Sequence, residues 1–335
     1  MKKRIIWIDI LRIVGMIGVI TIHITKNTIE TFGLSGMAKI FFLIICNLCN
    51  FTLPLFVMVS GSLLLSKDIC YKEIFVKYIK RMLLVIIFIG GIFAFMEEFY
   101  INRRIDVLLF YNVINRIITG RLWEHMWYLY LIIALYLITP LLRVWCKNSD
   151  KRSQQVLLII LFITTVLKYD MSNLFNIDIA FYVPITVGFV FAYLFGYYLY
   201  NNEISSKMQI ILNILGILAV ITIILLTYFN IACYLIDYTS TLSIIVTANV
   251  YLLIKKVNIA SIKICNIISL LGECSFGIYI FHQLFINIIY KILKFNIILN
   301  FPYVFLPIYI LVIFITTFIC VYLLRKINVM RKYFI

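Results

Sequence analysis

The chain has 335 residues, of which 64% are hydrophobic, and its mean hydropathy of +1.07 excludes an ordinary soluble domain. Its net charge of +16 does not indicate nucleic-acid binding, because the basic residues cluster in alternate connections between apolar segments. That distribution is typical of the cytoplasmic loops of membrane proteins. We therefore expect an all-α polytopic bundle embedded in the lipid bilayer, with no nucleic-acid partner. A single transmembrane domain, residues 1–335, leaves no separate soluble domain.

About ten segments are long and apolar enough to cross a hydrocarbon core about 30 Å thick. They span residues 5–25, 41–65, 80–97, 126–145, 154–168, 181–200, 209–229, 231–254, 267–290 and 302–324. The distribution of Lys and Arg predicts that both termini are cytoplasmic. Segment 154–168 has the shortest apolar core, so a re-entrant hairpin is its alternative. If it failed to cross, the basic C-terminus would lie outside.

Two connections and one cysteine pair are distinctive. Residues 66–80 alternate apolar side chains with lysines, a pattern that predicts an amphipathic helix on the cytoplasmic surface. Residues 97–125 form the longest outer loop, for which a functional role and a simple connection are equally good interpretations. Cys46 and Cys49 lack the further ligands that a zinc site needs, so we expect no metal site and two small buried side chains.

The first apolar segment carries the most informative residues. Arg12 and His23 are eleven positions apart, so on a helix they share one face, about 20° apart in angle and about 16 Å apart in height. Asp9 can pair with Arg12, and Gly15 and Gly18 leave room for a neighbouring helix. Ionisable groups are costly in hydrocarbon, which favours a functional set. The alternative is that Asp9 and Arg12 extend to the inner interface and His23 to the outer one.

Four stretches resemble the acyltransferase-3 family, whose members are integral membrane enzymes that O-acylate carbohydrates. Residues 8–12, Ile-Asp-Ile-Leu-Arg, followed by His23, are similar to the signature of its first helix. Residues 54–65 are similar to its second-helix run, which ends in a Ser-Gly pair. Residues 125–129, His-Met-Trp-Tyr-Leu, and residues 275–282, Ser-Phe-Gly-Ile-Tyr-Ile-Phe-His, resemble two later segments. The likeness extends from residue 5 to about residue 290.

The resemblance implies transfer of an acyl group from acyl-CoA to a hydroxyl of a cell-envelope or exported glycan, free or lipid-linked. Acetyl is the preferred group, and succinyl is the alternative. His23 is then the general base, since the pKa of histidine lies near neutrality. Arg12 is expected to bind a phosphate of the donor. Ser60 and Gly61 either line the donor path or pack a neighbouring helix. Acyl-CoA is a co-substrate, and we expect no tightly bound cofactor.

The remaining candidates have two interpretations each. Glu124, His125 and Trp127 form an acceptor subsite or belong to an interfacial aromatic belt. Ser275, Tyr279 and His282 share one helix face, which we expect to point inward. His282 then has three possible roles: it orients His23, it binds the acceptor, or it only packs against neighbouring helices. Glu273 is expected at the start of this helix, where a carboxylate favours the helix dipole.

The implied protein is a multi-pass enzyme of the bacterial cell membrane. Larger relatives carry a hydrolase-like domain after the membrane part, whereas this chain ends at Ile335. The main alternative is an exporter of a glycan or of its lipid-linked precursor, since buried ionisable groups also suit transporters. A third is a membrane-embedded partner in an envelope assembly complex. The sequence carries no signal for an oligomeric state.

Overall fold

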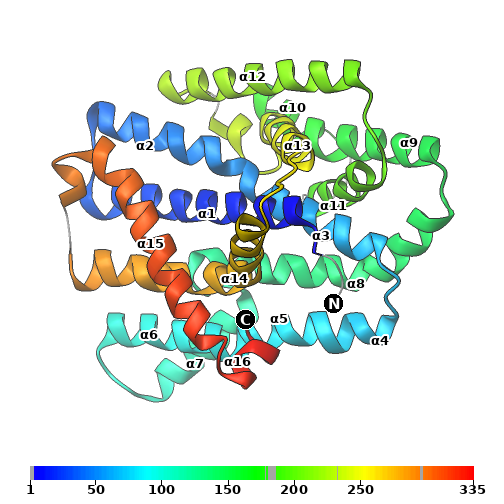
Figure 1. The fold of residues 1–335 in the computed structure, drawn as a ribbon. Coiled ribbons are helices and arrows are strands. Elements are labelled where there is room, and N and C mark those ends of the chain that lie inside the picture. The colour runs from blue at the N-terminus through cyan, green and yellow to red at the C-terminus, as the bar shows by residue number, and fades with distance from the viewer. Residues whose placement is uncertain (1–3, 178, 180–185, 232, 295–296) are drawn as a thin grey trace. The chain divides into compact units, whose positions relative to one another are not determined.

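The computed structural model describes residues 4–177, 179, 186–231, 233–294 and 297–335 (Figure 1). Within these residues the secondary structure is helical and includes no strand, which confirms the all-α prediction. Eight helices in this part of the chain are long and apolar enough to cross a membrane. Two of the ten predicted spans, residues 181–200 and 231–254, fall on shorter helices, and part of the first lies outside the described residues.

The helices follow one another with short connections. They are α1 (Ile6–Phe32), α2 (Gly36–Leu48), α3 (Thr52–Ser66), α4 (Tyr71–Glu73), α5 (Lys80–Leu84), α6 (Gly91–Asn102), α7 (Val107–Thr119), α8 (Trp127–Asn148), α9 (Lys151–Leu161), α10 (Lys168–Phe175), α11 (Thr186–Asn201), α12 (Ser206–Tyr228), α13 (Thr241–Lys255), α14 (Ile262–Asn287), α15 (Pro302–Leu324) and α16 (Asn328–Tyr333). Wider π turns at Ile74–Ile79 and Val85–Gly90 join α4, α5 and α6 into one helix, Tyr71–Asn102.

Three expectations about segments are changed by the helix bounds. The amphipathic helix predicted for residues 66–80 begins only at Tyr71 and continues into the next span. Segment 154–168 belongs to a continuous helix, Lys151–Phe175, whose 25 residues are enough to cross a bilayer. Residues 97–125 are not a loop, because the end of α6 and the whole of α7 lie within them.

The described chain divides into two compact units. Unit 1 consists of Met1–Ser66 and Ser149–Ile319, and unit 2 of Lys67–Asn148 and Cys320–Ile335. Each unit is therefore built from segments that are far apart in the sequence. The prediction of a single domain over residues 1–335 stays a prediction.

Small residues bring the helices of unit 1 into close contact. A Cβ atom on Gly61 of α3 would lie 1.9 Å from the backbone oxygen of Tyr193 in α11, and one on Gly196 would lie 2.1 Å from the backbone oxygen of Met58. The hydroxyl of Ser62 donates to the Gly196 carbonyl at 2.9 Å. Backbone therefore rests on backbone where α3 crosses α11, and no larger side chain fits there.

Helix α1 packs against α3 through the two glycines that the sequence singled out. A Cβ atom on Gly15 would lie 2.7 Å from the ring of Phe56, and one on Gly18 would lie 2.2 Å from the methyl group of Thr52. The prediction that Gly15 and Gly18 accommodate a neighbouring helix is confirmed. On its other side, α1 runs along α14, and these two helices carry the candidate site (Figure 1).

Unit 2 has a buried carboxylate of its own. Glu98 of α6 accepts hydrogen bonds from Arg116 at 2.6 Å, from Asn112 at 3.0 Å and from Asn102 at 3.2 Å. Three donors compensate the buried charge, so this cluster explains the packing of α6 against α7. Helices α6 and α7 therefore form an ordered helical hairpin.

Candidate active site

Helix α1 carries the first two candidate residues on one face. It is continuous from Ile6 to Phe32, so the predicted angular relation of Arg12 and His23 holds in the structure. His23 is buried, whereas the side chain of Arg12 is 30% exposed. Burial of His23 between helices excludes the alternative in which its imidazole extends to the lipid interface. The same face of α1 therefore carries an accessible cation, Arg12, and an enclosed imidazole, His23.

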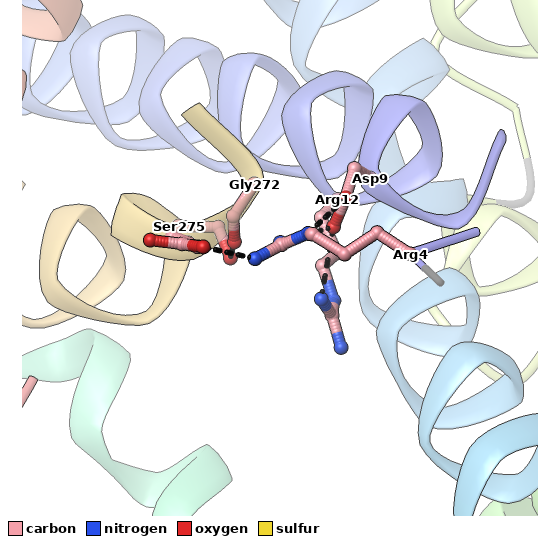
Figure 2. A network of polar contacts seen from close by, with 6 residues as sticks. Arg4, Asp9, Arg12, Gly272 and Ser275 are labelled. Carbon is pink, nitrogen blue, oxygen red and sulfur yellow. Dashed lines mark hydrogen bonds and ion pairs between the residues drawn. The ribbon is translucent and has the colours of Figure 1, made fainter. Parts of the chain in front are cut away.

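A cluster of four charged residues surrounds the start of α1. Arg4 donates to both carboxylate oxygens of Asp9, at 2.9 Å and 2.8 Å, and Arg12 donates to one of them at 3.1 Å. Figure 2 shows Arg4 and Arg12 converging on Asp9. Arg4 also donates to Glu273 of α14 at 2.5 Å. The predicted pair of Asp9 and Arg12 is confirmed, but Asp9 holds two guanidinium groups rather than one.

Asp9 is fixed in place by α14. Only 2% of the residue is exposed, and a Cβ atom on Gly272 would lie 2.5 Å from its carboxylate oxygen. Gly272 therefore lets the carboxylate sit directly against the helix backbone. Hydrogen bonding to Asp9 raises the pKa of Arg4 above its usual value against the opposing effect of burial, so the guanidinium stays charged.

A pair of histidines lies further along the same two helices. The ring of His282 in α14 is fully buried, and its centroid lies 5.2 Å from that of His23. At this separation a nitrogen of one ring can come within hydrogen-bonding distance of the other ring. The structure therefore brings together two of the three histidines in the chain, from segments 259 positions apart.

The backbone of α14 defines which nitrogen of His282 carries the proton. Nδ1 lies 2.8 Å from the carbonyl oxygen of Tyr279 and 3.2 Å from that of Ile278. A carbonyl oxygen only accepts hydrogen bonds, so Nδ1 must be the donor. In the neutral ring, Nε2 is then the basic nitrogen. This tautomer is the one that presents an acceptor at the buried end of the ring.

The inward face predicted for α14 is confirmed, since Ser275, Tyr279 and His282 are all buried. Ser275 donates to the carbonyl of Gly272 at 2.8 Å (Figure 2). The expectation for Glu273 is wrong, because α14 begins at Ile262 and Glu273 lies in its interior. Its carboxylate pairs with Arg4 instead of with a helix N-terminus.

The contacts of Gly61 favour the packing interpretation over a donor path, since the Tyr193 backbone fills the space beside it. Ser60 is half-buried. The acceptor candidates Glu124, His125 and Trp127 belong to unit 2, and the structure relates them only to residues of that unit. There His125 is buried in a 3₁₀ turn and Trp127 is 38% exposed, as expected of a residue in an aromatic belt.

Sequence reasoning did not identify Arg4 as a site residue. Arg4 precedes the apolar segment, where a basic residue is typical of a cytoplasmic flank. The signal that could have identified it is the short spacing to Asp9, a carboxylate whose burial calls for more than one cation. Among the described residues no group of three or more His, Cys, Asp or Glu side chains is arranged to hold a metal ion.

Comparison with known proteins identifies the family of the chain. The family model described as an acyltransferase domain matches residues 5–325, nearly the whole chain. The match defines the class of protein, an acyltransferase built from membrane helices. The chain belongs to the acyltransferase-3 family. No curated protein and no solved structure matches it.

Proposed function

We propose that the protein transfers an acyl group, acetyl or succinyl, from acyl-CoA to a hydroxyl of a cell-envelope or exported glycan. The observation that carries the proposal is the buried pair of His23 and His282 on the same helices as the charged cluster. An enclosed base suits a reaction that must exclude water, since hydrolysis would waste the thioester. The reaction would fall in the class of acyltransferases that transfer groups other than amino-acyl groups.

The chemistry assigns His23 the role of general base. Its imidazole takes the proton of the acceptor hydroxyl, and the oxygen attacks the carbonyl carbon of the thioester. The tetrahedral intermediate then collapses, the carbon–sulfur bond breaks, and the departing thiolate takes the proton from the imidazolium. The products are an ester and free CoA, and His23 returns to its neutral form. No covalent enzyme intermediate is needed.

His282 supports His23 as a positioning residue. Its Nδ1 is held by backbone carbonyls, so its basic Nε2 is the nitrogen that could accept a hydrogen bond from His23. Such a bond would orient His23 and stabilise the imidazolium that forms during the reaction. Tyr279, whose ring lies 6.1 Å from that of His282, would line the same space.

Arg12 would contact a donor phosphate at the cytoplasmic end of α1. The helix rises about 16 Å between Arg12 and His23, which gives the pantetheine arm a path along one helix face. Glu124, His125 and Trp127 of unit 2 stay candidate contacts for the acceptor. The protein would act in the plasma membrane of a bacterium, where donor and glycan lie on opposite sides.

The test compares cells that make the parent protein with cells that make His23→Ala at the same level. The O-acyl content of envelope glycans is measured by mass spectrometry before and after mild alkali, which removes O-esters. Esters present only with the parent protein support the proposal. Equal esterification in both would refute it, and loss of an unmodified glycan from the cell surface would identify an exporter instead. Asn27→Ala, four residues along the same helix, is the control for membrane insertion.

A further inference from the structure

The charged cluster around Asp9 has a composition that suits a polyanionic ligand. It contains two guanidinium groups, of Arg4 and Arg12, and two carboxylates, of Asp9 and Glu273. The set is formally neutral. The arginines are adjacent only because one carboxylate bridges them, since like charges at this separation otherwise repel.

The two carboxylates differ in how easily they could be replaced. Asp9 is buried against Gly272 and holds Arg4 through two hydrogen bonds, so it is part of the framework. Glu273 accepts a hydrogen bond from Arg4 at 2.5 Å, and its side chain is 41% exposed. An anion that arrives from solvent therefore competes with Glu273 and leaves Asp9 in place.

Both arginines are partly accessible. Their side chains are 33% exposed for Arg4 and 30% for Arg12, while Asp9 beneath them is closed to solvent. Guanidinium groups bind phosphate through paired donors, and two of them at one place suit a ligand with more than one phosphate group. A diphosphate matches this arrangement better than a single carboxylate does.

We propose that Arg4 and Arg12 together bind the phosphate groups of the CoA donor, and that Glu273 is an exchangeable counter-ion that occupies Arg4 until the donor displaces it. This inference rests on the proposed function, because it assumes a CoA thioester as substrate. It adds Arg4 as a donor-binding residue and gives Glu273 an inhibitory effect on donor affinity. Asp9 acts as the fixed support of both arginines.

The experiment measures CoA binding to purified protein in neutral detergent, with Glu273→Gln as the main variant. Glutamine keeps the size of the side chain and removes its charge, so we expect CoA to bind about 3- to 10-fold more tightly. Arg4→Gln should bind CoA about 10-fold more weakly. The control is Glu203→Gln, an exposed carboxylate between α11 and α12, which should leave the affinity unchanged.

A second substrate separates phosphate recognition from a general effect on the site. S-acetylpantetheine carries the thioester without the nucleotide phosphates, so neither Glu273→Gln nor Arg4→Gln should change its turnover. Equal changes with both substrates, or no change of CoA affinity in Glu273→Gln, would overturn the inference. Failure of the parent protein to bind CoA would instead refute the proposed function, so the two failures are distinguishable.

A lipid headgroup is the other source of phosphate near a membrane. CoA binding is therefore repeated in nanodiscs with and without phosphatidylglycerol. An affinity that does not depend on this lipid supports a donor site. If phosphatidylglycerol abolishes CoA binding in the parent protein and Arg4→Gln removes that effect, the arginines hold lipid phosphate and the inference is wrong.

Discussion

Replacing His282 by asparagine and by glutamine distinguishes the roles of its two ring nitrogens, Nδ1 and Nε2. Asparagine places its amide near the position of Nδ1, where it can still donate to the carbonyls of Tyr279 and Ile278. Glutamine places its amide near the position of Nε2, where its oxygen can accept a hydrogen bond from His23. If His282 acts on His23 through Nε2, His282→Gln should retain more activity than His282→Asn.

The size of the difference follows from the charge that develops on His23. While His23 is neutral, a hydrogen bond to position 282 contributes about 0.5–1.5 kcal/mol, and with the imidazolium it contributes about 1.5–3 kcal/mol. The transition state therefore gains about 1–1.5 kcal/mol more than the ground state. Since about 1.4 kcal/mol corresponds to a factor of ten, kcat of the asparagine variant should fall about 5- to 10-fold further.

The assay follows release of CoA at saturating donor, with kcat and the donor KM determined separately. The KM should be the same in both variants, because the proposed phosphate contacts lie at the other end of α1. Thermal unfolding in detergent provides the folding control. If His282→Asn retained activity and His282→Gln lost it, the backbone contact of Nδ1 would be the one that supports catalysis. Equal kcat in both folded variants would also contradict the reasoning.

Three further predictions concern stability. Gly61→Ala should destabilise the fold by about 1–3 kcal/mol, because its Cβ atom meets the Tyr193 backbone, whereas Gly91→Ala, with 3.6 Å of space, should be tolerated in the same thermal unfolding assay. Glu98→Gln leaves Arg116 without a charged acceptor and should cost about 1.5–3 kcal/mol, and an unchanged unfolding temperature would contradict this. Hydrogen bonding to Lys147, aided by Arg143, lowers the pKa of Asp68. The stabilisation of the folded protein by ionised Asp68 is therefore complete above the usual pKa of about 4 and is lost as the pH falls through the lowered value. The unfolding temperatures of the parent and Asp68→Asn should therefore differ at pH 6 and converge in acid; a constant difference would refute the assignment.

Much of the fold was predictable because bilayer-spanning helices have a strong sequence signal. The apolar segments, the common face of Arg12 and His23, and the contact surface of Gly15 and Gly18 all follow from hydropathy and helical periodicity. Helix bounds were less predictable. The helix carrying Glu273 starts five residues before its predicted segment, because Lys263 interrupts the apolar run without interrupting the helix.

Helix α7 was missed although its ends are marked in the sequence. The side chain of Asp106 accepts a hydrogen bond from the backbone of Leu109 at 2.8 Å, and Gly120 ends the helix with φ of 71°. The apolar residues Leu109, Val113 and Ile117 recur every four positions between them. The many charges around this segment predict a loop, either functional or a simple connection.

The partners within the site could not be predicted, because they join distant parts of the chain. Arg4 and Glu273 are 269 positions apart, and no local pattern links them. The same holds for His23 and His282. The sequence predicts that the helix face with His282 points inward, but it does not predict the 5.2 Å separation of the two rings. Close approach at Gly272 makes the first pairing possible, and a glycine inside a helix is the only hint of it in the sequence.

The most direct test of the account follows labelled acetyl-CoA with purified parent protein, Arg12→Ala and His23→Ala. We predict that the parent binds the donor and transfers its acetyl group, that Arg12→Ala loses most of the binding, and that His23→Ala binds normally without transferring. If folded parent protein neither binds nor consumes the thioester, or if His23→Ala transfers at the parental rate, the assignment of donor and base is contradicted.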